Sequence, residues 1–186
     1  MTVEAQTSTT TWKLDPAHTT VEFAVKHMMF TTVRGRFRTV SGTIAVDERN
    51  PDRSRVDVEI EAASIDTGVA DRDAHLRSAD FLDTENQPMI TFTSKRVQGA
   101  HLKAGDRFKV TGDLTIRGKA IEVVLDASFE GAGKDPWGNE RAGFSATTEI
   151  DRRGWGLTWN QALETGGLLV ANTLKIEIDA QAVKAG

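Results

Sequence analysis

The sequence predicts an all-β protein whose antiparallel strands each bury one face. Apolar and polar residues alternate in one segment after another, which is typical of a half-buried strand because successive side chains point to opposite faces. Turn signals rich in glycine, proline and asparagine separate these segments. One charged stretch, residues 67–83, interrupts the alternation and has helical spacing. About eight strands spaced in this way are typical of a sandwich or an up-and-down barrel.

Each predicted strand has an apolar face that we expect to point into the protein. In chain order these faces are Val21, Phe23, Val25 and His27; Val56, Val58, Ile60 and Ala62; Ile90 and Phe92; Phe108, Val110, Leu114 and Ile116; Ile121, Val123, Leu125 and Phe129; Phe144, Ala146, Thr148 and Ile150; and Leu174, Ile176, Ile178 and Ala180. Phe37 is out of phase with Ile44. The strand is therefore expected to bulge or bend between Arg38 and Gly42, most naturally at Gly42, so that both can face inward.

The charged stretch is predicted to be a short helix that lies against the strands. Asp71 can cap its start, and Leu76, Ala79 and Leu82 recur every three residues as a narrow apolar stripe. About twelve residues cannot hold a helix alone in water, so the stripe must dock on the sheet. Its charged residues can either hold a polar head group or fix the helix in place through ion pairs and loop carbonyls. These residues are Arg72, Asp73, His75, Arg77 and Asp80.

Composition excludes several classes of function. A chain of 186 residues suits one domain, and its net charge of −4 is spread along the sequence, so nucleic acid is not an expected partner. There is no cysteine, and the four histidines have no zinc-site spacing, so we expect no metal and no cofactor. Nucleophile elbows and phosphate-binding glycine loops are also absent. We therefore predict no catalytic residues and no enzymatic activity.

Residues 71–83 closely resemble the signature of the YceI-like family. Shorter matches follow the same order and spacing along the chain: residues 12–18, 21–27, 35–37, 41–44, 64–68, 87–92 and 112–118. The resemblance covers residues 12–183 as one domain and leaves residues 1–11 as a flexible N-terminal segment. It implies an eight-stranded antiparallel lipocalin-like barrel, with the short helical segment near residues 71–83 lying beside an opening. A barrel of this size is either filled by side chains or holds one small ligand.

The resemblance also implies a function. Members of the family bind polyisoprenoids, so we expect non-catalytic binding, transport or storage of a long-chain isoprenoid, an isoprenoid quinone or a related lipid inside the barrel. From strand parity, the expected ligand contacts are Phe23, Val25, His27, Phe37, Ile44, Val58, Ile60, Phe92, Leu114, Ile116 and Phe144. Two alternatives stay open. One is an enzyme that uses His27 or Asp73 as acid or base, and the other is a ligand-free, stress-related interaction module.

Three further expectations concern individual residues and location. His27 either meets the polar end of a ligand or is a buried histidine bonded within the protein. Trp155, Trp159 and Asn160 are predicted to lie in a loop that lines a mouth or covers the core. Residues 1–11 show no secretory signal, so we expect a cytoplasmic protein, although periplasmic and secreted relatives exist. We expect no stable membrane insertion, and the resemblance implies a homodimer because the family often forms dimers.

Overall fold

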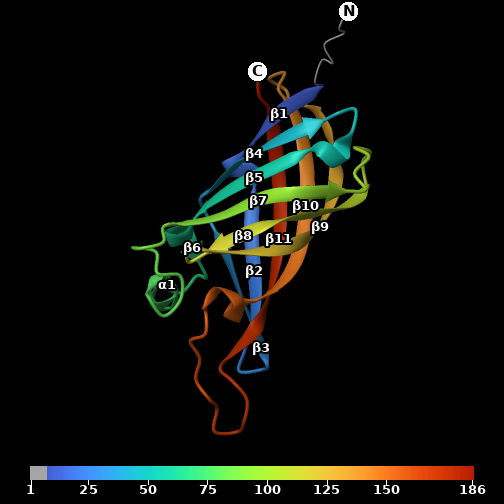
Figure 1. Cartoon of the computed structure of the whole chain (residues 1–186). Coiled ribbons are helices and arrows are strands. Elements are labelled where there is room, and N and C mark those ends of the chain that lie inside the picture. The colour runs from blue at the N-terminus through green and yellow to red at the C-terminus, as the bar shows by residue number, and fades with distance from the viewer. Residues whose placement is uncertain (1–7) are drawn as a thin grey trace, which may run out of the picture.

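A computed structural model describes residues 8–186, which form a closed barrel of eight antiparallel strands (Figure 1). The strands of the barrel, in spatial order, are β1 (Thr9–Leu14), β4 (Val40–Asp47), β5 (Arg55–Glu61), β7 (Met89–Gln98), β8 (Arg107–Ile116), β9 (Lys119–Lys134), β10 (Glu140–Asp151) and β11 (Val170–Lys184). Pairing of β1 with β11 closes the ring. The predicted all-β class and the eight-stranded barrel are confirmed.

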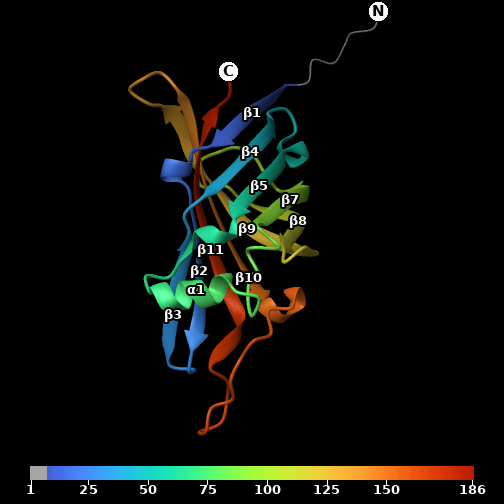
Figure 2. The ribbon, with the colours of Figure 1, turned by 90° about the vertical axis from the view of Figure 1, so that its left-hand side faces the viewer.

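A hairpin extends the barrel at the end opposite to β1 and the carboxyl end of β11 (Figures 1 and 2). It consists of β2 (Thr20–His27) and β3 (Thr31–Phe37), and the two-residue strand β6 (Ile65–Asp66) pairs with β3. β1 and β2 both pair with β11. β1 pairs with the carboxyl end of β11, and β2 pairs with the earlier part of β11. The barrel wall therefore continues past β1 as the β2–β3 hairpin.

The phase change predicted between Arg38 and Gly42 is present, but it lies at Arg38 and Thr39 and not at Gly42. β3 ends at Phe37 and β4 begins at Val40, so Phe37 and Ile44 lie on different strands and a break between them changes the phase. The described strands shift register elsewhere, between Ser94 and Arg96 of β7 and between Gly143 and Phe144 of β10. Sequence parity showed that the phase changed, but could not distinguish a bulge from the end of a strand.

The helix α1 (Ala70–Arg77) is shorter than predicted and begins differently. Its N-cap position is Val69, which makes no side-chain cap, so the expected cap by Asp71 is wrong. After Arg77 the chain turns, and the Leu82 N–H donates to the Leu76 carbonyl over 3.0 Å. This turn buries Phe81 and Leu82 while Ala79 stays exposed, so the predicted stripe was wrong at Ala79. In Figure 2 α1 lies in front of the β2–β3 hairpin, and it contacts β6.

Four short 3-10 helices join the strands and help to close the barrel. They are η1 (Pro16–His18), η2 (Pro51–Arg53), η3 (Ala62–Ser64) and η4 (Arg152–Trp155). The largest buried apolar cluster joins β1, β4 and β5 to the segment after α1 and to η4. None of the helices within residues 8–186 combines the length and the apolar character needed to span a membrane.

Candidate ligand cavity

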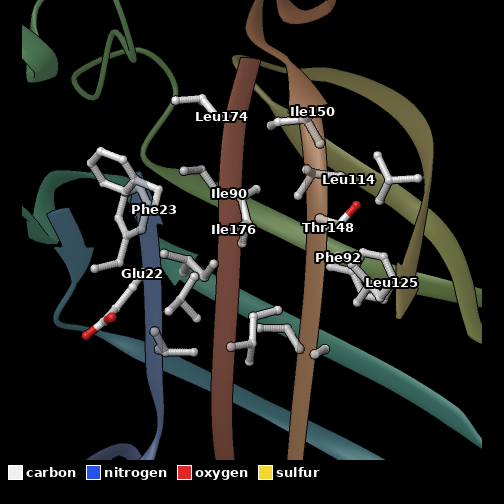
Figure 3. Close-up of a pocket in the computed structure, with 18 of the residues that line it drawn as sticks. Glu22, Phe23, Ile90, Phe92, Leu114, Leu125, Thr148, Ile150, Leu174 and Ile176 are labelled. Carbon is white, nitrogen blue, oxygen red and sulfur yellow. The ribbon is translucent and has the colours of Figure 1, made fainter. Parts of the chain in front are cut away.

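The barrel encloses a cavity of about 270 Å³. Side chains from every strand, β1 to β11, contribute to its wall, and nearly all of them are apolar. Figure 3 shows Phe92, Leu114 and Ile176 directed into the enclosed space, whereas the carboxylate of Glu22 points away from it. Because apolar surface gains free energy when it leaves water, such a wall favours an apolar guest.

The inward side chains in the middle of the strands leave part of their surface uncovered. Val56, Val58, Leu114, Val123 and Ile176 all line the cavity, yet each is only half-buried. Side chains in a filled barrel interlock at crystal-like density and leave few voids. These five residues therefore turn their remaining exposed surface toward the cavity, and the barrel is hollow.

Two glycines let aromatic rings lie flat against the wall. A Cβ atom at Gly35 would come within 2.4 Å of Phe23 Cζ, and one at Gly112 within 2.6 Å of Phe92 Cζ. Each ring therefore occupies the space above a glycine on the neighbouring strand. The two phenylalanines contribute a large apolar surface without blocking the lumen. Strand parity identified the rings, but it did not assign this role to the glycines.

Most of the predicted contact residues meet in this cavity. The residues from the predicted set that line it are Phe23, Val25, Phe37, Ile44, Val58, Ile60, Phe92, Leu114, Ile116 and Phe144. His27 is not among the lining residues. It is half-buried at the end of β2, opposite Thr31 and Val170.

Sequence reasoning missed the lining residues that lie outside the strands. Leu76 of α1, Phe81 and Leu82 of the following turn, and Leu157 after η4 all line the cavity. Their apolar character was visible in the sequence. The three-residue spacing had placed Leu76 and Leu82 on the docking stripe, but nothing in the sequence indicated that Phe81 and Leu157 face inward or that any of the four reaches the cavity.

Arg152 is the most unusual lining residue because it is a buried cation in an apolar wall. Its exposed fraction is 2%, and it begins η4. The guanidinium donates to the carbonyls of Ala171 (2.9 Å), Leu157 (2.6 Å), Trp159 (3.0 Å) and Val170 (3.3 Å). This one side chain ties the loop between η4 and β11 to the barrel.

No carboxylate within residues 8–186 forms an ion pair with Arg152, and its neighbour Asp151 pairs with Arg153 instead at 2.6 Å. Burial lowers the pKa of the Arg152 guanidinium because a low-dielectric site disfavours its charge. An arginine nevertheless stays protonated in proteins. The apolar cavity therefore borders a positive charge that four carbonyl dipoles and the nearby Asp151 carboxylate offset without an ion pair.

The charged residues of α1 hold that segment in place. Arg77 donates to the carbonyls of Ala63 (2.8 Å) and Ile65 (3.0 Å). Arg72 donates to the hydroxyl and the carbonyl of Thr67, and buried Asp73 accepts from the N–H and hydroxyl of Thr67. None of these three charged residues lines the cavity. The geometry favours the docking role over the head-group role.

The two tryptophans of the predicted loop play different parts. Trp155 is buried, and its indole N–H donates to the Leu114 carbonyl over 2.9 Å. Trp159 packs edge-on against the His75 ring, with centroids 4.6 Å apart, and tilts against Phe81 at 5.4 Å. The side chain of Asn160 bonds both backbone groups of Val170. Neither tryptophan lines the cavity; Trp155 belongs to the main buried apolar cluster, and Trp159 packs against it.

Over the described part of the chain, no group of three or more histidine, aspartate and glutamate side chains is placed to hold a metal ion. His75 does bond Asp80, Nε2 to Oδ2, at 2.9 Å. The two residues lie on α1 and in the turn that follows it, beside the rings of Phe81 and Trp159. The cavity wall itself combines apolar contacts with a single cation.

Fold and site together define a closed antiparallel barrel with an apolar internal cavity, which is the architecture of lipocalin-like binding proteins. Comparison with known proteins specifies the class further. The model of the YceI-like domain matches residues 12–182, and the chain belongs to this family. Protein YceI of Escherichia coli O157:H7 is 45% identical over 133 residues, which span 72% of this chain and 68% of that protein.

Solved structures share the fold. BcnA of Burkholderia cenocepacia superposes with a TM-score of 0.77 and is 24% identical, covering 90% of this chain and 98% of its own. A polyisoprenoid binding domain from Saccharophagus degradans superposes with a TM-score of 0.70 and is 14% identical, covering 94% of this chain and 98% of its own. At these identities the likeness establishes the architecture.

Proposed function

We propose that this protein binds a long-chain isoprenoid, an isoprenoid quinone or a related amphiphile inside its barrel, and carries or stores it without chemical change. The observation that supports the proposal is the hollow, apolar lumen of about 270 Å³. This volume lies near the lower end of the roughly 300–1,000 Å³ of small-molecule pockets, so a slender chain suits it better than a bulky ring system. The fold shared with a polyisoprenoid binding domain supports the same ligand class.

Burial of the chain supplies the driving force. At about 0.8 kcal/mol per methylene, ten buried methylenes contribute on the order of 8 kcal/mol before the costs of association. The ten predicted apolar residues that line the lumen, Phe23 and Phe92 among them, are the proposed contacts. No step of bond making or breaking is needed for this function.

We place the polar end of the ligand toward Arg152. A buried guanidinium attracts groups that accept hydrogen bonds, such as a quinone carbonyl, a carboxylate or a diphosphate. Its four carbonyl partners already hold it beside the lumen. An amphiphile oriented in this way keeps its apolar chain against the strands and its acceptor beside the cation.

Native mass spectrometry after gentle purification, followed by lipid extraction, tests the proposal. We expect a co-purifying apolar molecule, or one that can be titrated into the emptied protein. If neither is found, the carrier function is wrong. His27→Ala addresses the enzymatic alternative, because a carrier keeps most of its affinity whereas an enzyme that uses His27 loses turnover.

A further inference from the structure

The end of the barrel opposite β1 exposes a cluster of apolar side chains, which we call the apolar tip: Met28, Met29, Phe30 and Leu168. Phe30 is 80% exposed and Met29 66%. Three of the four lie at the turn of the β2–β3 hairpin, and Leu168 lies in the loop before β11. Figures 1 and 2 show both segments projecting together beyond the barrel.

The two segments form one surface. The Met28 N–H donates to the Leu169 carbonyl over 2.8 Å. The Met29 sulfur lies so close to Gly167 that a Cβ atom there would come within 2.4 Å of it. The turn of the β2–β3 hairpin and the loop before β11 therefore form the tip together. Arg152 ties that loop to the barrel.

The apolar residues occupy turn positions where other residues would be more stable. The Phe30 N–H donates to the His27 carbonyl over 3.2 Å, and the two central residues have φ values of 50° for Met28 and 66° for Met29. These features match a type I′ turn, which strongly favours Asn-Gly because both central residues have positive φ. Methionine side chains have a steric cost there. Requirements of the turn do not account for this choice.

Charge around the tip has the opposite sign to that of the whole protein. Residues 23–35 contain two basic residues, Lys26 and Arg34, and no acidic residue, although the chain has a net charge of −4. Arg36 lies toward the far end of β3 and Arg38 just after it, where Arg38 pairs with Asp66. Lys26 and Arg34 are exposed on the two strands of the hairpin. The loop contributes one acidic residue, Glu164. A protruding apolar end with a basic collar is complementary to an anionic lipid surface.

The tip also adjoins the cavity. Val25 and Val170 line the cavity. Val25 lies three residues before Met28, and Val170 lies two residues after Leu168. A long apolar ligand has a high cost in water, so exchange is easiest where the cavity end meets a bilayer. We propose that the apolar tip docks reversibly on an anionic phospholipid bilayer, so that ligand passes between the membrane and the lumen. This inference rests on the proposed function for its purpose, but the docking itself is measured separately.

Flotation with vesicles of equal parts phosphatidylcholine and phosphatidylglycerol tests the docking. We expect the protein to float with these vesicles and to bind vesicles of phosphatidylcholine alone at least tenfold less. Added salt should weaken the binding because it screens Lys26 and Arg34. Failure of the full-length protein to bind the anionic vesicles overturns the proposal.

Three variants test whether the apolar tip is the surface that binds the vesicles. Phe30→Ser should reduce binding at least tenfold. Trp137→Ser is the matched control, because Trp137 is also an exposed aromatic residue, 82% exposed. It lies in the turn between β9 and β10, at the end of the barrel opposite the apolar tip (Figure 1). The double change Met28→Asn with Met29→Gly should also reduce binding while leaving the protein at least as stable, because it installs the preferred turn. If the Trp137 and Phe30 changes reduce vesicle binding equally, or if neither tip variant reduces it, the apolar tip is not the docking surface.

Ligand content separates this inference from the proposed function. Mass spectrometry of the same preparations reports whether the lumen holds lipid. Protein that holds lipid but does not float disproves the docking alone, and protein that floats but never holds lipid disproves the carrier function alone. Sedimentation velocity completes the test, since a tip that joins two copies of the chain and binds no vesicles would also overturn docking.

Discussion

The ring of Phe92 on β7 lies directly over Gly112 on β8, in the space that any larger residue's Cβ atom would occupy. A Cβ atom at Gly112 would also come within 2.5 Å of the Thr93 carbonyl oxygen, so the backbone as well as the ring restricts this position. The width of the lumen thus depends on a residue without a side chain.

Gly112→Ala should therefore destabilise the protein and push the Phe92 ring into the lumen. Overpacking of a well-packed site typically costs about 1–3 kcal/mol, and we expect a loss in that range together with weaker ligand binding. Urea unfolding and ligand titration measure the two effects. Gly133→Ala is the control, because nothing lies within 4 Å of a Cβ atom at Gly133. Equal effects at both positions would contradict this account.

Adjacent valines on β9 test whether ligand occupies the lumen. Val123 lines the cavity, while the next residue, Val124, is 43% exposed on the outside of the barrel. Val123→Phe should lower lipid affinity at least tenfold because the larger side chain fills the lumen, whereas Val124→Phe should not. Titration of each variant with a fluorescent long-chain lipid measures this, with circular dichroism as a check on folding. Unchanged affinity in the Val123 variant would show that ligand binds elsewhere.

Arg152→Met should destabilise the protein and loosen the loop between η4 and β11. The change removes the side-chain donor of three buried or half-buried carbonyls, those of Leu157, Trp159 and Ala171, while the Val170 carbonyl keeps the Asn160 amide; one unsatisfied buried group alone costs about 1–3 kcal/mol. Urea unfolding and hydrogen exchange of residues 156–170 measure the loss. The neighbouring Arg153→Met removes an exposed pair with Asp151, and we expect an effect of at most about 1 kcal/mol. A reversed order of the two effects would contradict the role of Arg152.

The carboxylates that Arg141 contacts should make stability depend on acid pH. Hydrogen bonds from Arg141, and then from His18, lower the pKa of Asp15 from 3.8 to about 2, and Arg141 also lowers the pKa of Asp135. A lowered pKa in the folded state stabilises the protein above the unfolded value and loses that contribution as pH falls through the folded value. The contribution is therefore present near neutral pH and fades between about pH 4 and pH 2.

Arg141→Met should consequently destabilise the protein at pH 6, and the difference from the wild type should shrink toward pH 2. Urea unfolding across this range measures the difference. Lys109→Met serves as the control, since it removes a basic residue whose pair with Asp126 lies on the exposed barrel surface. A difference that stays constant with pH would mean that Arg141 acts through packing alone.

The regular part of the fold was predictable because a strand has a two-residue period. Phe23, Val58 and Phe144 were assigned to the interior from that period, and all three line the cavity. The end of β3 and the end of α1 were misplaced, since breaks in a strand and turns after a helix depend on tertiary contacts such as those of Arg77.

Arg152 shows why the rest of the site escaped sequence reasoning. It stands beside Arg153 in the sequence, yet one side chain is buried and the other pairs in solvent with Asp151. Only the path of the loop back to Val170 brings four carbonyls around Arg152. The spacing of residues in the sequence does not predict that path. A buried cation without a carboxylate is therefore a feature that the structure alone reveals.

The seam between β1 and β11 has a consequence for folding. It joins the first and last strands of the chain through only three residue pairs, Trp12 to Lys184, Lys13 to Val183 and Leu14 to Ala182. Contacts so distant in sequence form slowly. On the ribosome, β1 and β2 must wait with one edge unpaired until β11 has been synthesised, and chaperones that shield strand edges would act on this nascent chain during that interval.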